Sequence, residues 1–275
     1  MNPSQLIAKL SQDFLEAGIE SAEADAKELI CHALSISKSD LMMLELENKL
    51  IDEPQLTEII ELSKKRQNRV PLQHLTGISF FRNLELLVGP GVFVPRPETE
   101  SLVELALGLE LPEKTSIEIG TGSGAISIAL STEGQFEATA IEVSTEAASW
   151  AEKNIAKSNA NVNLQIQDFN LFSSDEKYGL LISNPPYIPS GAIPIDPEVN
   201  LYDPDIALYS GEDGLDLIRV LADSKHLLLA GGVLLFEHDE SQRESIVQLL
   251  LDKGWQNVRH FQDLNGRDRF IQAVA

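Results

Sequence analysis

The chain contains little cysteine, few basic residues and no long apolar run. Cys31 is the only cysteine among 275 residues, which excludes an intrachain disulfide and a cysteine-based zinc site and is typical of a reducing cytosol. No segment approaches the length of a membrane span, and the first residues lack the basic and apolar regions of a secretion signal. We therefore expect a cytoplasmic protein without membrane association.

Basic residues are outnumbered: 21 Lys and Arg stand against 43 Asp and Glu, a formal net charge of −22. Such a chain repels a phosphate backbone unless its cations are clustered. One cluster exists, and we interpret it as the solvated last turn of a helix, with a nucleic-acid contact as the alternative: Lys64, Lys65, Arg66 and Arg69. The five histidines show no ligand spacing, so we expect no metal.

Residues 1–75 have the pattern of short helices and predict a helical domain. In the first helix apolar residues recur on one face, from Leu6 to Phe14, with Ser4 as the expected cap and Gly18 as the stop. Residues 76–97 differ, because short apolar runs surround a Gly-Pro-Gly turn; they predict a hairpin or connector leading to a helix near Pro97.

From about residue 113 apolar segments alternate with helical ones. The segments "TSIEIG", "ATAIEV", "NLQIQ", "YGLLIS" and "GVLLFE" predict strands, and the tail can add two more. This alternation is typical of the α/β class, with a doubly wound, mostly parallel, seven-stranded sheet. We assign residues 98–275 to this second domain.

A glycine-rich loop follows the first of these strands, in "IEIGTGSGAISIAL". The backbone of this loop can approach a ligand closely at the start of a helix, because three of its residues are glycines: Gly120, Gly122 and Gly124, with Thr121 and Ser123 between them. Glu142 at the end of the next strand can accept hydrogen bonds from ribose hydroxyls. A nicotinamide dinucleotide and S-adenosylmethionine share both requirements, so these residues do not choose between them.

Two further features favour S-adenosylmethionine. Glu118 precedes the glycines, where a carboxylate suits a cationic sulfonium and disfavours a pyrophosphate. Asp168 and Phe169 follow the third strand, where they can accept the adenine amino hydrogen and pack on its ring.

The motif Asn184, Pro185, Pro186, Tyr187 ends the fourth strand. When an amide nitrogen attacks a sulfonium methyl, positive charge grows on that nitrogen and its hydrogens. Acceptors held there bind the transition state better than the ground state, and the Asn184 oxygen and the Pro185 carbonyl are such acceptors. Tyr187 can pack on the planar target group. These residues point to methylation of an amide or aromatic amine.

With these motifs the chain resembles the protein-(glutamine-N5) methyltransferases that modify class I peptide-chain release factors. The resemblance covers nearly the whole chain and includes "PLQHLTG", "VPRPETE", "NPPY", "DPEVNLYDPDIALYSGEDGLDLIR" and "GRDR". It implies a Rossmann-like methyltransferase domain, S-adenosylmethionine bound by the glycine loop, Glu142 and Phe169, and a substrate glutamine of the GGQ motif held by residues 184–187. It also implies a helical N-terminal domain that contacts the release factor, and a role in translation termination.

Some positions depart from the family pattern. Glu118 and Glu142 stand where Asp is more usual, and Asp239 in "FEHDESQ" replaces a glycine, although Glu237 and Gln242 match. If that glycine requires a positive φ, Asp tolerates the conformation better than most residues.

Alternatives remain open. A nucleic-acid amino methyltransferase, acting on adenine in DNA or guanine in ribosomal RNA, is the second hypothesis, although the chain lacks an evident basic groove. An inactive cofactor-binding scaffold is the third. Arg96 either faces the mouth of the active site, where it would bind substrate, or pairs with Glu98 or Glu100. We expect a monomer that binds no nucleic acid.

Overall fold

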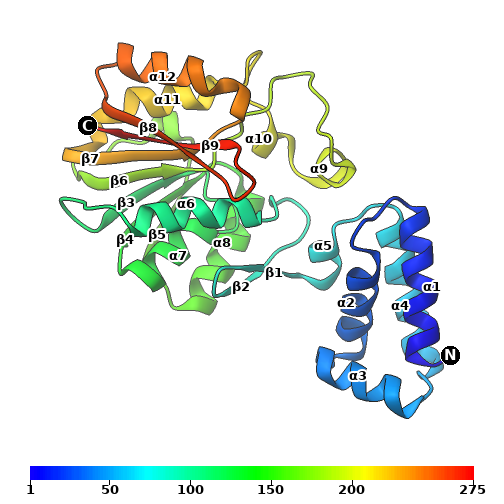
Figure 1. Ribbon diagram of the computed structural model, residues 1–275. Helices are drawn as coiled ribbons and strands as arrows, with labels where there is room; N and C mark the ends of the chain where they lie inside the picture. The colour runs from blue at the N-terminus through cyan, green and yellow to red at the C-terminus, as the bar shows by residue number, and fades with distance from the viewer. The chain divides into compact units, whose positions relative to one another are not determined.

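The computed structural model describes all of residues 1–275, which divide into two compact units. The first unit comprises residues 1–78 and 194–202, and the second comprises residues 79–193 and 203–275. The short segment 194–202 was not expected in the first unit, because it follows the Asn-Pro-Pro-Tyr motif in the chain. Figure 1 shows the elements of both units in order along the chain.

The first unit is built of helices around its own apolar core. Its helices are α1 (Pro3–Glu16), α2 (Ala22–Leu34), α3 (Lys38–Glu47), α4 (Glu53–Gln67), α5 (Leu72–Thr76) and, from the later segment, α9 (Pro197–Tyr202). The apolar face that runs from Leu6 to Phe14 is buried in this core. Cys31 is buried there too, and burial raises the pKa of its thiol.

The cap expected for α1 is wrong by two residues. Asn2 is the N-cap: its side chain accepts a hydrogen bond from the Gln5 amide at 2.9 Å, and Gln5 completes a capping box. Pro3 then occupies the first helical position, where its missing N–H costs nothing. The helix ends as expected, with Gly18 at a φ of 74° directly after the C-cap.

The basic cluster at the end of α4 is not simply solvated, so that interpretation is wrong for its two arginines. The buried Arg66 donates to Asp25 of α2 at 2.7 Å and lies 2.8 Å from Glu198 of α9. Arg69 shares Glu198 at 3.1 Å, and the Tyr202 hydroxyl donates to the Asn68 carbonyl at 2.7 Å. These polar contacts attach segment 194–202 to the first unit.

The second unit is a three-layer α/β structure whose seven strands follow the order β5-β4-β3-β6-β7-β9-β8. The strands are β3 (Thr115–Ile119), β4 (Glu137–Glu142), β5 (Val162–Ile166), β6 (Tyr178–Ser183), β7 (Leu228–Glu237), β8 (Gln256–Gln262) and β9 (Asp268–Val274). Strands β3 to β7 pair in parallel and β9 is antiparallel to both neighbours. The predicted fold class, a doubly wound and mostly parallel seven-stranded sheet, is confirmed.

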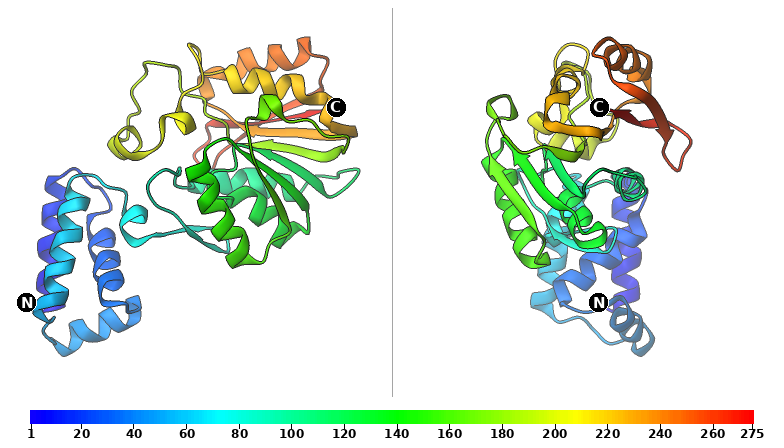
Figure 2. Two further views of the ribbon diagram at one scale, coloured as in Figure 1. Left: turned by 180° about the vertical axis from the view of Figure 1, so that it is seen from behind. Right: turned by 90° about the vertical axis from the view of Figure 1, so that its left-hand side faces the viewer.

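Helices cover both faces of this sheet (Figure 2). An apolar cluster under one face involves α6 (Pro97–Leu107), α7 (Ala125–Gly134) and α8 (Thr145–Ser158). The cluster under the other face involves α11 (Asp216–Asp223) and α12 (Arg243–Asp252); the short α10 (Asp205–Leu208) precedes α11. A small two-stranded sheet, β1 (Ile78–Phe81) with β2 (Leu84–Leu87), precedes α6 in the segment expected to form a hairpin or connector.

The order of the strands fixes where a ligand can bind. The chain runs outward from β3 through β4 to β5, then returns to place β6 on the other side of β3. A crevice forms at the carboxyl ends of strands where the order reverses in this way. The glycine loop after β3 and the Asn-Pro-Pro-Tyr motif after β6 both lie at that point.

Candidate active site

The backbone at the C-terminal end of the Asn-Pro-Pro-Tyr motif is held by hydrogen bonds to other segments of the chain. The Ile188 amide donates to the Leu208 carbonyl at 2.9 Å, and the Ser210 amide donates back to the Ile188 carbonyl at 3.0 Å. Gln242 donates its side-chain amide to the Tyr187 carbonyl at 2.8 Å. A Cβ added at Gly214 would lie 2.2 Å from the Tyr187 carbonyl oxygen, so only glycine fits there. The segments around residues 208–214 and 242 therefore fix the position of Tyr187.

Asn184 is half-buried and oriented by one side-chain contact. Its Nδ2 donates to the hydroxyl of Thr99 in α6 at 3.2 Å. Its Oδ1 accepts no hydrogen bond from the chain, and neither does the carbonyl of the buried Pro185. Two neighbouring acceptors at the switch point are thus available to a ligand.

Tyr187 and Thr99 both contact Glu237, the last residue of β7. The Thr99 hydroxyl donates to Oε2 of Glu237 at 2.8 Å, and the Tyr187 hydroxyl donates to Oε1 at 3.3 Å. Burial raises the pKa of Glu237 to about 7, against the lowering effects of these donors and of Arg269. Burial also raises the pKa of the Tyr187 phenol, so this hydroxyl stays protonated at neutral pH.

The glycine loop has a left-handed backbone at each of its three glycines. Gly120, Gly122 and Gly124 have φ values of 72°, 58° and 86°, which are unfavourable for other residues. A Cβ at Gly120 or Gly122 would meet nothing within 4 Å, so both face open space. At Gly124 it would lie 3.0 Å from Ile128, so this glycine allows the loop to pack closely on α7.

Glu118 lies beneath the loop and is 1% exposed. Its Oε2 accepts from the Thr121 hydroxyl at 2.7 Å, from the Ser127 amide at 3.0 Å and from the Ser127 hydroxyl. It thereby satisfies a free N–H in the first turn of α7. Burial is the main cause that raises the pKa of Glu118 to about 7, and the neighbouring Glu142 adds to it.

Glu142 is buried at the carboxyl end of β4, adjacent to the loop. Its Oε2 accepts from the Gly122 amide at 2.8 Å and its Oε1 from the Ser144 amide at 2.9 Å. Each oxygen keeps a lone pair for a further donor, such as a ribose hydroxyl. Asp168 caps a short 3-10 turn through the Asn170 amide at 2.8 Å, and the Phe169 ring beside it stacks on Phe172 at 6.0 Å.

Ser123 and Thr121, the polar residues of the loop, are buried and bonded within the protein. Thr121 donates to Glu118, as described, and the Ser123 carbonyl accepts from Asn154 of α8 at 2.9 Å. These contacts hold the loop in one shape, and any contact of theirs with a cofactor stays a prediction.

Arg96 pairs with neither Glu98 nor Glu100. Its guanidinium lies 2.9 Å from Asp203 and 5.1 Å from the centre of the Phe93 ring. Glu100 instead accepts from the Arg82 amide at 3.0 Å. A role of Arg96 in substrate binding stays a prediction.

Asp239 does not occupy a left-handed backbone conformation. Its φ is −76°, and its side chain caps the following 3-10 turn by accepting from the Ser241 amide at 3.0 Å. The Asp239 amide donates to the Gln242 side chain at 3.1 Å, which completes a capping box. Asp therefore stabilises the turn that positions Gln242, and no glycine is needed there.

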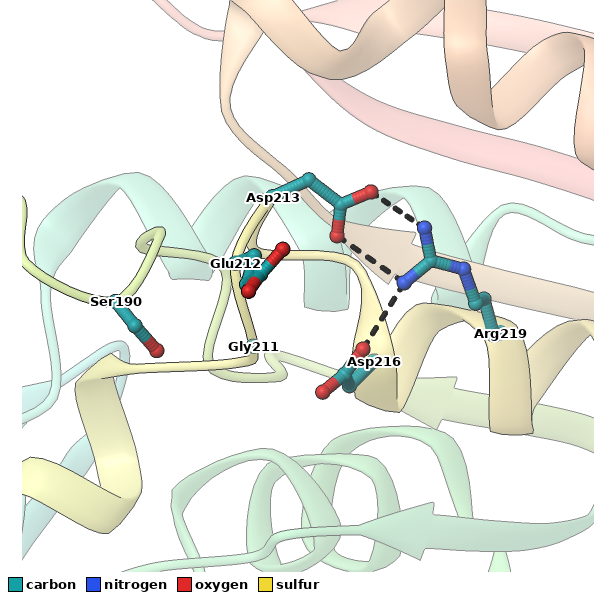
Figure 3. A pocket seen from close by; sticks show the side chains of 6 residues that line it. All are labelled: Ser190, Gly211, Glu212, Asp213, Asp216 and Arg219. Atoms are coloured by element: carbon teal, nitrogen blue, oxygen red, sulfur yellow. Dashed lines mark hydrogen bonds and ion pairs between the residues drawn. The ribbon is translucent and has the colours of Figure 1, made fainter.

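A separate surface hollow of about 410 Å³ lies beside this region and is lined by Ser190, Gly211, Glu212, Asp213, Asp216 and Arg219 (Figure 3). Arg219 pairs with Asp213 and with Asp216, the latter at 3.0 Å. None of these residues belongs to the glycine loop or to residues 184–187, so we do not assign the hollow to the active site. No group of His, Cys, Asp or Glu in the structure could hold a metal ion, and no helix has the length and apolar character to cross a membrane.

Sequence reasoning gave Thr99 no role, assigned Glu237 and Gln242 none beyond matching the family, and left the contacts of residues 208–214 unassigned. Glu237 carried a usable signal, because a carboxylate at the end of the buried run "VLLFE" needs a partner. Thr99 carried none, since a threonine in the first turn of a helix is unremarkable in a sequence.

The fold is that of the class I methyltransferases, and similarity to known proteins agrees with this. Residues 85–195 match the methyltransferase small domain and residues 5–77 match the PrmC N-terminal domain. The fold resembles a methyltransferase from Pyrococcus furiosus, with a TM-score of 0.55 and 19% identity over 70% of this chain and 89% of that one.

Full-length relatives identify the family. The chain is 38% identical to a release factor glutamine methyltransferase of Streptomyces coelicolor, over 97% of this chain and 96% of the relative. It is also 38% identical to one of Deinococcus radiodurans, over 99% and 98%. The chain belongs to the release factor glutamine methyltransferases and is an enzyme.

Proposed function

We propose that this chain transfers the methyl group of S-adenosylmethionine to the side-chain amide nitrogen of a glutamine in a class I peptide-chain release factor, and so acts on translation termination. The observation that carries the proposal is the orientation of Asn184. Its nitrogen is bonded to Thr99, which leaves its oxygen to accept from a substrate N–H. A planar amide substrate presents such N–H groups.

The residues around the glycine loop suit S-adenosylmethionine. Gly120 and Gly122 leave room against the backbone, Glu142 keeps acceptor capacity, and the buried Glu118 favours a cation nearby. Bound there, the cofactor supplies an electrophilic methyl group. Asp168 and Phe169 would contact its adenine.

The chain's own part in the reaction is to bind and orient the target amide. An amide nitrogen is a weak nucleophile because its lone pair is delocalised into the carbonyl. As the nitrogen attacks, its hydrogens become more acidic, and the Asn184 oxygen and the Pro185 carbonyl stabilise them. Tyr187, fixed by Gln242 and Glu237, limits the plane in which the amide can lie. The extra proton is lost to solvent after transfer, so no strong base is required.

The helical unit is proposed to recognise the release factor, and the protein is proposed to act as a cytoplasmic monomer that binds no nucleic acid. The net charge of −22 supports the last point. A truncated chain should begin at Ser79, because Phe81 and Leu86 are fully buried in the methyltransferase unit. We expect it to bind cofactor and to lose methylation of an intact release factor.

The proposed function is tested with radiolabelled S-adenosylmethionine and three substrates offered separately: a class I release factor, ribosomal RNA and DNA. We expect label only on the release factor, sensitive to protease and absent when the GGQ glutamine is replaced by asparagine. Label on either nucleic acid, removed by nuclease, would support the alternative of a nucleic-acid amino methyltransferase.

A further inference from the structure

Two buried polar side chains, Thr99 and Glu237, enter the mechanism described above only through their contacts with Asn184 and Tyr187. They are 4% and 3% exposed and lie 138 positions apart in the chain, yet their side chains meet at 2.8 Å. Thr99 comes from the first turn of α6 and Glu237 from the end of β7. Burying a carboxylate is costly unless it has a specific partner, so the pair requires an explanation.

The direction of the hydrogen bonds made by Thr99 and Glu237 explains why the pair is buried. A hydroxyl has a single hydrogen, and that of Thr99 is donated to the Glu237 carboxylate, which can only accept when ionised. Towards Asn184 the Thr99 oxygen is therefore an acceptor. It can bond to the amide nitrogen of Asn184, at 3.2 Å, and would repel the amide oxygen.

We propose that Thr99 and Glu237 are positioning residues that fix which way the Asn184 amide faces, so that its oxygen points to the substrate glutamine. The inference rests on the proposed function. Without this arrangement the amide can rotate by half a turn and present N–H groups to the substrate N–H. Two donors would then face each other where the transition state needs an acceptor.

The same carboxylate also orients the other end of the motif. Its second oxygen accepts from Tyr187, and the Arg269 guanidinium lies 6.0 Å from the centre of the Tyr187 ring. The charged groups that act on Glu237 are Arg269 of β9 and Glu98 of α6. Burial raises the pKa of Glu237 to about 7. Below that pH the protonated carboxyl could itself donate, so the direction of both hydrogen bonds would no longer be fixed.

The first test is single-turnover methylation of a release factor with both ligands saturating. We expect Thr99→Val, which keeps the shape and removes the hydroxyl, to slow methyl transfer by on the order of tenfold to a hundredfold, as small errors of placement do. The dissociation constants for cofactor and release factor should stay within about twofold of wild type, since the loss is in orientation. Thr99→Ser should recover most of the rate.

Three further variants separate positioning from a general structural role. Thr139→Val also deletes a buried hydroxyl in this unit, on β4, which β3 separates from β6, and should leave the rate unchanged. The double variant Thr99→Val with Asn184→Ala should be no slower than Asn184→Ala alone, because the hydroxyl acts through the amide. In Glu237→Gln the side-chain amide can donate to Thr99, which would reverse the direction of the hydrogen bonds between residues 237, 99 and 184. We expect this variant to transfer the methyl group more slowly and to lose the dependence of the rate on pH near 7.

The rates of these variants decide whether Thr99 acts through Asn184. A wild-type rate for Thr99→Val, or losses that add in the double variant, would overturn the inference. If Thr99→Val does not fold, Glu237→Gln and Thr99→Ser decide the question by the same rates. A wild-type enzyme that methylates no release factor would instead refute the proposed function, so the two failures are distinguishable.

Discussion

Glu118 should couple the binding of S-adenosylmethionine to the release of a proton. Burial raises the pKa of this carboxyl to about 7 in the free protein. A sulfonium cation nearby favours the ionised form and lowers the pKa, because opposite charges attract strongly where water is excluded. The free protein is thus largely protonated below pH 7 at this position, and the complex is not.

The size of the effect follows from the two pKa values. If the cation returns the Glu118 pKa to near its ordinary value of 4.5, each pH unit below 7 costs about 1.4 kcal/mol of binding free energy. Between pH 8 and pH 6 the cofactor Kd should then rise about tenfold. Above about pH 7.5 it should be flat, since the carboxyl is ionised in both states.

Calorimetry measures this coupling directly. At pH 7 about half a proton should be released per cofactor bound, visible as a dependence of the apparent enthalpy on the ionisation enthalpy of the buffer. S-adenosylhomocysteine carries the same amino group without the sulfonium charge, so its Kd should depend less on pH. Glu118→Gln keeps an acceptor for the Ser127 amide and is the matched control, with no dependence expected from this site.

The reasoning fails if the wild-type Kd for S-adenosylmethionine is the same at pH 6 and pH 8. It also fails if Glu118→Gln keeps the full dependence. In either case Glu118 would serve only to hold the loop and α7 in place, through Thr121 and Ser127.

Three more predictions concern single side chains. Asn184→Ala should lower kcat by about 10²–10³, as for loss of one preorganised partner of a developing charge, with little change in cofactor affinity; a near wild-type single-turnover rate would refute the mechanism. Glu142→Ala should raise the cofactor Kd by an amount equivalent to about 1.5–3 kcal/mol, measured by calorimetry, and unchanged affinity would remove its assignment to the ribose. Arg66→Met should destabilise the first unit by about 3–5 kcal/mol in urea unfolding, because it leaves Asp25 and Glu198 charged beside an apolar side chain, and a loss under 1 kcal/mol would contradict this.

The sheet could be predicted from the sequence because its signals are local. Four of the five parallel strands are short, mostly buried segments, and β5 at the edge alternates apolar with polar residues. The loops after β3 and β6 contain residues that cannot continue a strand. The switch point then follows from topology, since the carboxyl ends of parallel strands share one edge. Candidate site residues such as Gly120 and Asn184 could be identified for this reason.

Side-chain pairings across long separations could not be predicted in the same way. In the sequence Arg66 looks like a cation that stabilises the C-terminus of a helix. Nothing near it reveals that its partner Glu198 comes from a segment 132 positions later. Arg96 likewise has nearer carboxylates than Asp203, the one it binds. Tertiary packing selects among partners that the sequence presents as equivalent, and only burial distinguishes them.

Segments that look unrelated in the sequence are combined around the Asn-Pro-Pro-Tyr motif. "VPRPETE" supplies Thr99 for the side chain of Asn184, and "FEHDESQ" supplies Glu237 for Thr99 and Gln242 for the Tyr187 carbonyl. The second segment thus controls both the amide and the backbone of the motif from one strand end. Its Asp239 can replace glycine without cost because the turn needs a cap and not a positive φ. Selection for methyl transfer should therefore act on Glu237 and Gln242 more strictly than on Asp239.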